Sequence, residues 1–445
     1  MGNILHKYTS SLTLAFIDVM CGDIPFYIAA YNGYDKILWL LFLINRSINY
    51  VVTPLFIRFR FNLIYILDNV HTPLFIASYL GCERVVEGFL KNDHAKHDVY
   101  MPLLFSTKNG HYKVVKLLLE NRDVNINEVS ENGSTLLIHA ASRGYDKVVK
   151  ILLEKEQIHV NQANKDGKTP LIIAAYKGHD KVVKILLEKE QICVNQADKN
   201  DQTPLITAAW EGHVKVVKML LEKELIRVNQ ADKNDQTPLI TAAFKGHDKV
   251  VEILLEKEQI LVNQADKNDQ TALITAAWVG HVKVVKILLE KEEIDVNHEN
   301  NVEVTALLAA VYKGHDKVVE IILGKEEILV NKSDSDGTTP LYLAASHGHD
   351  KVVDLLFKKE DIQLNTPIYN DNTPLFIAAR MGYHKVVKML LKKQDIKVNQ
   401  ANFEGSTPLS VAADERNGKI VDLLLGTEEI RAIGWNKWRP IASPA

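Results

Sequence analysis

Apolar and polar positions recur with a period of 34 residues through the middle of the chain. Three consecutive segments, 199–232, 233–266 and 267–300, are nearly identical. In each one a short apolar stretch ends in Ala-Ala, Gly-His follows, and a second apolar stripe then appears at helical spacing, such as Val216, Val217 and Leu220. Repetition at this period is typical of solenoids, in which each unit stacks on its neighbours to bury its apolar face.

Particular residue types predict where the helices of each unit begin and end. Thr203 is a suitable N-cap residue, and Pro204 occupies the first helical position, where no amide hydrogen bond is needed. Gly212 stands where the chain needs a left-handed residue between two helices. Each unit is therefore expected to contain two antiparallel helices and a projecting turn.

The pattern TPLxxAAxxGHxxVVxxLL, as in residues 203–221, resembles the ankyrin repeat. The helix-opening threonine recurs at Thr72, Thr135, Thr169, Thr203, Thr237, Thr271, Thr305, Thr339, Thr373 and Thr407, and Met101 occupies the same register. The glycine between the helices recurs at Gly81, Gly110, Gly144, Gly178, Gly212, Gly246, Gly280, Gly314, Gly348 and Gly382. Ten threonines plus Met101 give about eleven units.

The resemblance implies an all-α repeat solenoid of stacked ankyrin-type helix-turn-helix units with projecting β-turn or hairpin loops. We expect one continuous array over residues 71–425, with most repeats 34 residues long. Residues 1–70 are expected to form a divergent N-terminal cap with one degraded repeat around 24–42. Residues 426–445 are expected to form a short C-terminal cap or a truncated repeat.

Two departures from the family pattern carry further expectations. The family usually has a histidine after Thr-Pro-Leu, whereas this chain has Ile206 and equivalent apolar residues, so we expect a polar tie to be replaced by apolar packing. In the last unit Arg416 stands at the position of the glycine between the helices. Because an arginine is strained in a left-handed conformation, we expect this turn to be distorted or frayed.

Composition narrows the choice of partners and compartment. The formal net charge is −3 with 24% charged residues, so nucleic acid is not an expected partner. Three cysteines are too few and too scattered for a disulfide framework, which favours a reducing compartment, the cytoplasm or the nucleus. No apolar stretch reaches the roughly 18 to 20 residues of a membrane-spanning helix. We expect a monomer.

No motif predicts catalysis or a cofactor. Phosphate-binding, zinc-protease and nucleophile-elbow signatures are absent from the sequence. Histidines recur at the repeat period, at His179, His213, His247, His281, His315 and His349. Stacked helices lie about 8 to 10 Å apart, too far for equivalent side chains to share a zinc ion at about 2 Å. We therefore expect structural histidines, no metal, no cofactor, no small-molecule substrate and no enzymatic activity.

One feature points to a binding surface. The resemblance implies that the two positions after Ala-Ala lie on the concave surface, where the family commonly binds partners. The first position is aromatic in five consecutive units: Tyr176, Trp210, Phe244, Trp278 and Tyr312. The second position in these units reads Lys177, Glu211, Lys245, Val279 and Lys313. Large rings beside cations are typical of binding hot spots. The alternative is that each ring packs flat on the next repeat and only extends the core.

These features predict a protein-protein interaction scaffold or adaptor that binds a partner segment on the concave face of the solenoid. The expected partner-binding residues are Tyr176, Lys177, Trp210, Glu211, Phe244, Lys245, Trp278, Tyr312 and Lys313. A second hypothesis is a substrate receptor or targeting adaptor, in which the N-terminal 70 residues recruit another protein or a membrane and the repeats select the cargo.

Overall fold

A computed structural model describes residues 73–92, 99–121 and 124–431 of the chain. The expected N-terminal cap over residues 1–70 lies outside these ranges, as does most of the expected C-terminal cap. By its internal contacts the chain divides into two compact units, residues 1–199 and 200–445. Each unit is described by itself below.

In its described part the first unit consists of helix pairs. Its helices are α5 (Pro73–Leu80), α6 (Glu83–Asn92), α7 (Tyr100–Lys108), α8 (Tyr112–Asn121), α9 (Leu136–Arg143), α10 (Asp146–Leu153), α11 (Pro170–Lys177) and α12 (Asp180–Leu187). We call the odd-numbered helix of each pair the first helix and its partner the second helix. The left-handed Gly110 keeps the register expected for the segment at Met101, although α7 begins at Tyr100 with Val99 as its N-cap, before Met101.

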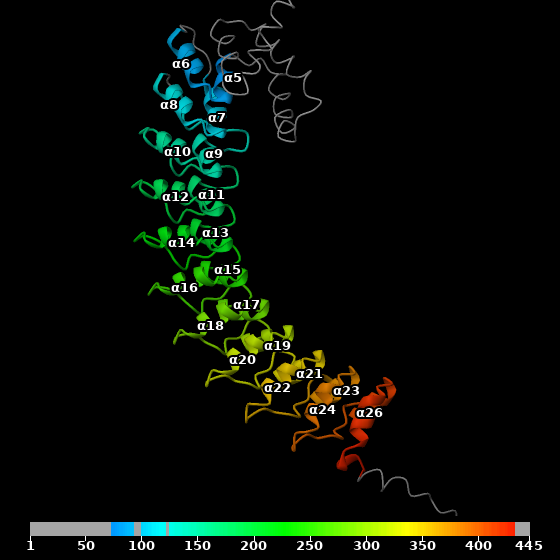
Figure 1. The fold of residues 1–445 in the computed structure, drawn as a ribbon. Coiled ribbons are helices and arrows are strands. Elements are labelled where there is room, and N and C mark those ends of the chain that lie inside the picture. The colour runs from blue at the N-terminus through cyan, green and yellow to red at the C-terminus, as the bar shows by residue number, and fades with distance from the viewer. Residues whose placement is uncertain (1–72, 93–98, 122–123, 432–445) are drawn as a thin grey trace, which may run out of the picture. The chain divides into compact units, whose positions relative to one another are not determined.

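The second unit continues the same pattern as far as the structure describes it. Its helices are α13 (Pro204–Glu211), α14 (Val214–Leu221), α15 (Pro238–Lys245), α16 (Asp248–Leu255), α17 (Ala272–Val279), α18 (Val282–Leu289), α19 (Ala306–Lys313), α20 (Asp316–Leu323), α21 (Pro340–His347), α22 (Asp350–Leu356), the 3₁₀ turn η1 (Tyr369–Asp371), α23 (Pro374–Arg380), α24 (His384–Leu390), α25 (Pro408–Asp414) and α26 (Gly418–Leu425). Within this unit the first helices form one row and the second helices another (Figure 1). No strand is assigned in the described residues, which confirms an all-α repeat solenoid.

The predicted helix boundaries are confirmed. The Thr203 side chain accepts a hydrogen bond from the amide of Ile206, at 3.2 Å between Oγ1 and N, and Pro204 occupies the first helical position. Helix α13 ends at Gly212, which has a left-handed φ of 75°. Ile206 is fully buried, so the expected replacement of a polar tie by apolar packing is also confirmed.

Small residues set the spacing between neighbouring first helices. Ala208, Ala209, Ala242 and Ala243 have no exposed surface at all. Because a methyl group is the only side chain at these positions, α13 and α15 approach closely and exclude water between them. Valine and leucine pairs of the second helices, represented by Val217, complete the apolar core of each repeat.

The periodic histidines form hydrogen bonds between one repeat and the preceding one. His247 precedes α16, and its Nε2–H donates to the carbonyl oxygen of Trp210 at 3.0 Å, across one repeat. Its ring lies against Gly212, where an added Cβ would be only 2.6 Å from Nδ1 of His247. His281 and Gly246 repeat this contact. The structural role expected for these histidines is thus confirmed, and the glycine is required for close approach as well as for its positive φ.

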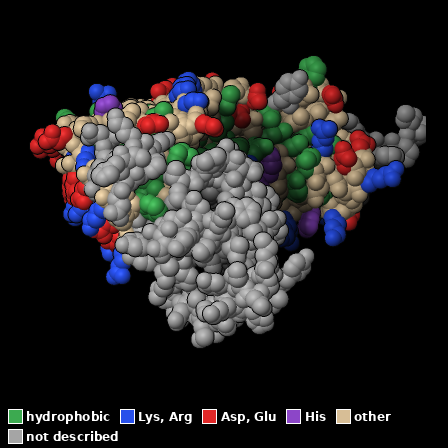
Figure 2. All heavy atoms as spheres, turned by 90° about the horizontal axis from the view of Figure 1, so that it is seen from above, with side chains coloured by type: hydrophobic (Ala, Val, Ile, Leu, Met, Phe, Trp, Pro, Cys, Tyr) green, Lys and Arg blue, Asp and Glu red, His purple; other side chains and the backbone are tan. Residues whose placement is uncertain are grey.

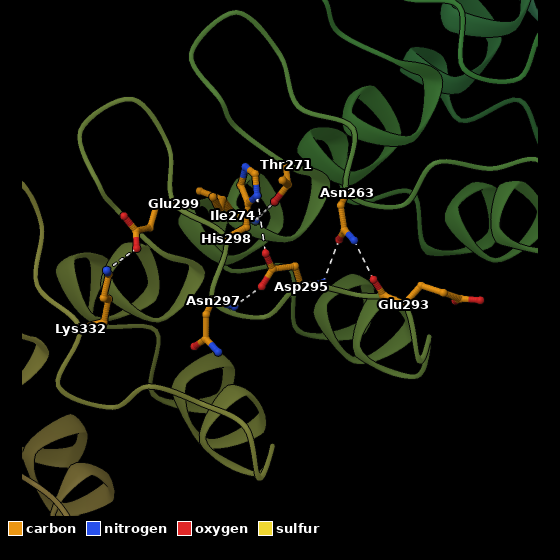
Figure 3. A network of polar contacts seen from close by, with 9 residues as sticks. All are labelled: Asn263, Thr271, Ile274, Glu293, Asp295, Asn297, His298, Glu299 and Lys332. Carbon is orange, nitrogen blue, oxygen red and sulfur yellow. Dashed lines mark hydrogen bonds and ion pairs between the residues drawn. The ribbon is translucent and has the colours of Figure 1, made fainter.

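A ladder of asparagines forms a second set of contacts between repeats, and Figure 3 shows the contact made by Asn263. The Asn263 side chain donates to the carbonyl oxygen of Glu293 at 2.7 Å and accepts from the amide of Asp295 at 2.9 Å. In the second unit the same donor contact is made by Asn229, Asn297, Asn331 and Asn365, and in the first unit by Asn127 and Asn161. Each asparagine thereby satisfies two backbone groups of the following loop.

The turn at Arg416 is not distorted, so that expectation was wrong. Arg416 adopts a left-handed φ of 58°. The amide of Asn417 still bonds the carbonyl oxygen of Ala412 at 2.8 Å. The Asn417 side chain also donates to the carbonyl oxygen of Ala379 at 3.1 Å, which replaces the histidine contact between repeats. A left-handed L-residue costs only about 1–2 kcal/mol, and these hydrogen bonds outweigh it.

We expect Glu303→Gly to stabilise the second unit. Glu303 lies in a projecting turn with φ of 58°, whereas the equivalent position two helices later is Gly337, with φ of 78°. Removing the strained side chain outweighs the extra chain entropy of glycine by about 0.5–1 kcal/mol. The midpoint of urea unfolding, followed by circular dichroism, should rise. Glu303→Ala keeps a Cβ and should leave the midpoint unchanged; an equal rise in both variants would contradict the explanation.

Asn263→Ala should destabilise the second unit by about 1–2 kcal/mol, since two hydrogen bonds to backbone groups are lost. The same urea unfolding measures this change. Asn268→Ala is the matched control, because Asn268 is exposed in the neighbouring turn and its side chain makes no hydrogen bond within the described residues. If both variants lowered stability equally, the asparagine ladder would not be the cause.

Candidate functional site

In α9 and in the first helices from α11 to α21, the last two residues reach the surface directly after two buried residues, which are alanines in all of them but α19. In the second unit Phe244, Trp278 and Tyr312 occupy the first of these positions and are 43–44% exposed, while Trp210 is half-buried. Their exposure follows from local geometry, because the helix ends one or two residues later at a left-handed glycine such as Gly246. The predicted aromatic residues of this unit therefore lie on one side of the row of first helices.

The rings associate in pairs. Trp210 and Phe244 stack with ring centroids 6.1 Å apart and ring planes 24° apart. Trp278 and Tyr312 stack more closely, at 5.4 Å and 8°. Both centroid distances fall in the range of favourable aromatic contacts. Within the described residues, no such contact joins Phe244 to Trp278, so two separate pairs are formed.

Each ring pair carries one lysine. The Nζ atom of Lys245 lies 3.9 Å from the Trp210 ring centroid and 5.9 Å from that of Phe244. Lys313 Nζ lies 4.2 Å from the Trp278 centroid and 5.4 Å from that of Tyr312. Contacts of this kind contribute about 0.5–1 kcal/mol at exposed sites. We call Trp210, Phe244 and Lys245 cluster 1, and Trp278, Tyr312 and Lys313 cluster 2.

Sequence reasoning missed one member of this surface. His347 stands 35 residues after Tyr312, the same separation that joins Lys245 to Trp210. Its ring meets that of Tyr312 edge-on with centroids 5.0 Å apart. The signal was present in the sequence, because His347 occupies the second position of its repeat, as Lys245 and Lys313 do in theirs, and all three lie against a ring of the preceding repeat. The predicted Glu211 belongs to neither cluster and forms no ion pair within the described part of the chain.

The first unit has a related but more basic arrangement. Tyr176 is 44% exposed, with Lys177 Nζ 5.2 Å and Lys168 Nζ 5.9 Å from its ring centroid. Lys168 was not predicted; it immediately precedes the N-cap residue Thr169. Lys168 was missed because it lies in the turn before α11, whereas the predicted binding residues were those at the ends of the first helices.

Further cations lie on the first helices of this unit. Burial, and then the charge of Arg143, lower the pKa of Lys108. Burial, together with the charges of Lys108 and Arg143, lowers the pKa of His139 to about 4 from 6.5. Within the described residues no carboxylate pairs with Lys108 or Arg143. This part of the surface is therefore positively charged and uncompensated.

The row of second helices has a different character. A groove of about 460 Å³ there is lined by α20, α22 and α24, with Asp316, Glu320, Asp350 and Lys351 among its residues. Lys351 and Asp316 form an ion pair at 3.2 Å across neighbouring repeats. Figure 2 shows acidic and basic side chains lying next to one another over much of the coloured surface, with hydrophobic side chains gathered beside histidines elsewhere on it. Exposed ion pairs such as that of Lys351 with Asp316 contribute about 0–1 kcal/mol to folding stability.

In the described residues, neither row contains a cluster of side chains that indicates a catalytic or metal-binding site. Over the described ranges, no three His, Cys, Asp or Glu side chains are placed to hold a metal ion. Among the helices that the structure describes, none is both long and apolar enough to cross a membrane.

The lowered pKa of His139 predicts a pH-dependent loss of stability in the first unit. The unfolded chain takes up a proton near pH 6.5, whereas the folded chain resists it until about pH 4. Stability therefore falls as pH falls through this interval. We expect the unfolding midpoint of wild type to fall more steeply between pH 7 and 4 than that of His139→Gln. His159→Gln, which removes an exposed histidine, should follow wild type; parallel curves for all three proteins would contradict this.

Comparison with known proteins agrees with the geometry. A family model of ankyrin repeats, built on three copies, matches residues 74–164, 155–232, 223–300, 292–368 and 360–432. No curated protein matches the chain significantly. These matches overlap one another and run without a gap from residue 74 to residue 432. The chain belongs to the ankyrin repeat family, whose repeats generally serve as protein-protein interaction modules.

Proposed function

We propose that this chain binds a segment of a partner protein across the exposed ends of its first helices, through clusters 1 and 2. The observation that carries the proposal is the exposure of three large rings in consecutive repeats. Phe244, Trp278 and Tyr312 are 43–44% exposed, whereas Leu239 and Leu273 on the same helices are 2% and 1% exposed. Rings of this size supply much of the binding energy of protein interfaces when a partner covers them.

The surroundings of the rings suit a binding surface. Their backbone is fixed by hydrogen bonds between repeats, such as the one from His247 to the carbonyl oxygen of Trp210. A fixed backbone reduces the entropy lost on binding, and stacked rings have few rotamers to lose. Lysines beside the rings add polar contacts that can orient the partner.

Two other functions have less support. The ankyrin repeat fold is typically non-enzymatic, and no described cluster of side chains suggests a reaction. Recruitment of a second protein or a membrane by residues 1–70 concerns a part of the chain outside the described ranges, and no described residue favours it.

Truncating the rings of the second unit should weaken binding strongly. A variant carrying Trp210→Ala, Phe244→Ala, Trp278→Ala and Tyr312→Ala removes both ring pairs. Partners would be captured from cell lysate with the wild-type chain and purified, and their affinities measured by titration calorimetry. Loss of even one hot-spot residue of about 2 kcal/mol weakens binding about thirtyfold, so we expect at least this loss, with an unchanged circular dichroism spectrum.

The matched control removes apolar surface elsewhere. Leu261→Ala and Leu329→Ala together truncate exposed residues of the loops that follow the second helices, where Leu261 is 58% and Leu329 is 55% exposed. This control should keep wild-type affinity. If the ring variant bound as tightly as wild type, or if the control lost affinity equally, the proposed surface would be wrong.

A further inference from the structure

Both rows of the described helices carry a net positive charge, but most of their acidic residues lie on the second helices, as in α16 and α20. The whole chain has a formal net charge of −3. In the first unit the first helices α5, α7, α9 and α11 contain no aspartate or glutamate, and they carry Lys108, Arg143 and Lys177. In the second unit the first helices carry Lys245, Lys313 and Arg380 against Glu211 and Asp414. The first helices thus place few carboxylates near their cations, whereas the second helices carry both signs, such as Asp316, Lys317 and Glu320 in α20.

The cations of the two rows also have different partners. On the second helices of the second unit, three lysines pair with aspartates of the preceding repeat: Lys283 with Asp248, Lys351 with Asp316, and Lys385 with Asp350, at 3.7, 3.2 and 3.4 Å. On the first helices, Lys245 and Lys313 lie over rings, and within the described residues no carboxylate pairs with either. An aromatic ring orients an ammonium group but leaves its full charge, so both lysines remain able to bind an anion.

We propose that the segment bound by clusters 1 and 2 is acidic, with aspartate or glutamate side chains bound by Lys245 and Lys313 and apolar side chains lying on the ring pairs. This inference rests on the proposed function and adds the chemistry of the partner. Each cluster combines an apolar platform with an uncompensated cation at its edge. Opposite charges on the partner would complete the ion pairs that the chain itself does not form.

A protein segment fits this surface better than a nucleic acid. A phosphate backbone carries a charge at every nucleotide and is bound by closely spaced cations. Among the described residues, Lys245 and Lys313 are the two lysines that lie over the four rings of clusters 1 and 2. Glu211, an acidic residue, follows Trp210 at the end of α13. Sparse cations among apolar rings match a chain in which acidic and apolar side chains are interspersed.

The clusters also set a spacing. Equivalent lysines lie two repeats apart, and packed helix axes are about 8–10 Å apart, so the two ammonium groups are roughly 16–20 Å apart along the row. An extended chain advances about 3.3 Å per residue. The acidic positions of an extended partner should therefore be about five or six residues apart.

A selection from a random peptide library tests the inference with the full chain. Peptides of about fifteen residues, long enough to reach both clusters in an extended form, would be displayed and selected on immobilised wild-type protein. We expect enrichment of Asp or Glu at two positions five or six residues apart, each beside an apolar residue. Enrichment of neutral or basic peptides, or no enrichment, overturns the inference.

A charge-reversal pair gives the second readout. Fluorescence anisotropy of a selected peptide should show at least about tenfold weaker binding to Lys245→Glu/Lys313→Glu, a change of about 1.4 kcal/mol. The control Lys283→Glu/Lys351→Glu makes the same change in net charge on the second helices and should bind like wild type. Equal loss in both variants, or tighter binding of a DNA oligonucleotide or a phosphopeptide than of the acidic peptide, overturns the inference.

The two proposals fail in different ways. If the ring variant loses the captured protein partner while the charge-reversal pair keeps it, the first-helix surface is the binding site and its partner is not acidic. If neither variant affects the captured partner, the binding surface lies elsewhere and both proposals fail.

Discussion

The contact between consecutive repeats is the constraint on which the rest of this structure depends. A single helix pair leaves one apolar side uncovered, and only the next pair can cover it. Buried alanines such as Ala208 and Ala242 allow the first helices to approach, and His247 can bond the carbonyl oxygen of Trp210 only because Gly212 has no side chain. Substitutions at these positions would therefore disrupt the packing between consecutive repeats.

The same constraint separates positions that hold the fold from positions that can carry function. The histidine and asparagine contacts between repeats reach backbone atoms, for example the carbonyl oxygens of Trp210 and Glu293. These hydrogen bonds therefore do not depend on the side chain of the residue whose carbonyl oxygen accepts them. The two residues that follow the buried pair, such as Phe244 and Lys245, can change without breaking the contact, so a ring and a lysine can be placed there at little cost in stability.

Local signals in the sequence predicted the helices because their causes are local. Thr203 and Gly212 act on their own turn, so both boundaries followed from the residues alone. The contact of Lys245 with the Trp210 ring could not be predicted from those residues alone, because it depends on how far one repeat is offset from the next. The role of Asn263 was missed for the same reason, although its recurrence at the repeat period was visible. Arg416 was judged from conformational strain alone, without the hydrogen bonds that offset it.

The surface itself could be predicted only in part. Recurrence identified the aromatic positions, but pairing of the rings depends on small differences between successive repeats that no period reveals. Recurrence also placed Lys245 and Lys313 next to the aromatic positions. Their distinctive feature, a ring in place of a carboxylate as neighbour, required the structure.

Side-chain footprinting by hydroxyl radicals tests the central claim most directly. The chain would be oxidised alone and in complex with a partner captured from cell lysate, and oxidation would be quantified at each residue. The account predicts that Trp210, Phe244, Trp278 and Tyr312 become protected in the complex, while Phe403, a turn residue that is 80% exposed, stays reactive. Protection of Phe403 and its neighbouring turns, with unchanged oxidation of the four rings, would contradict it.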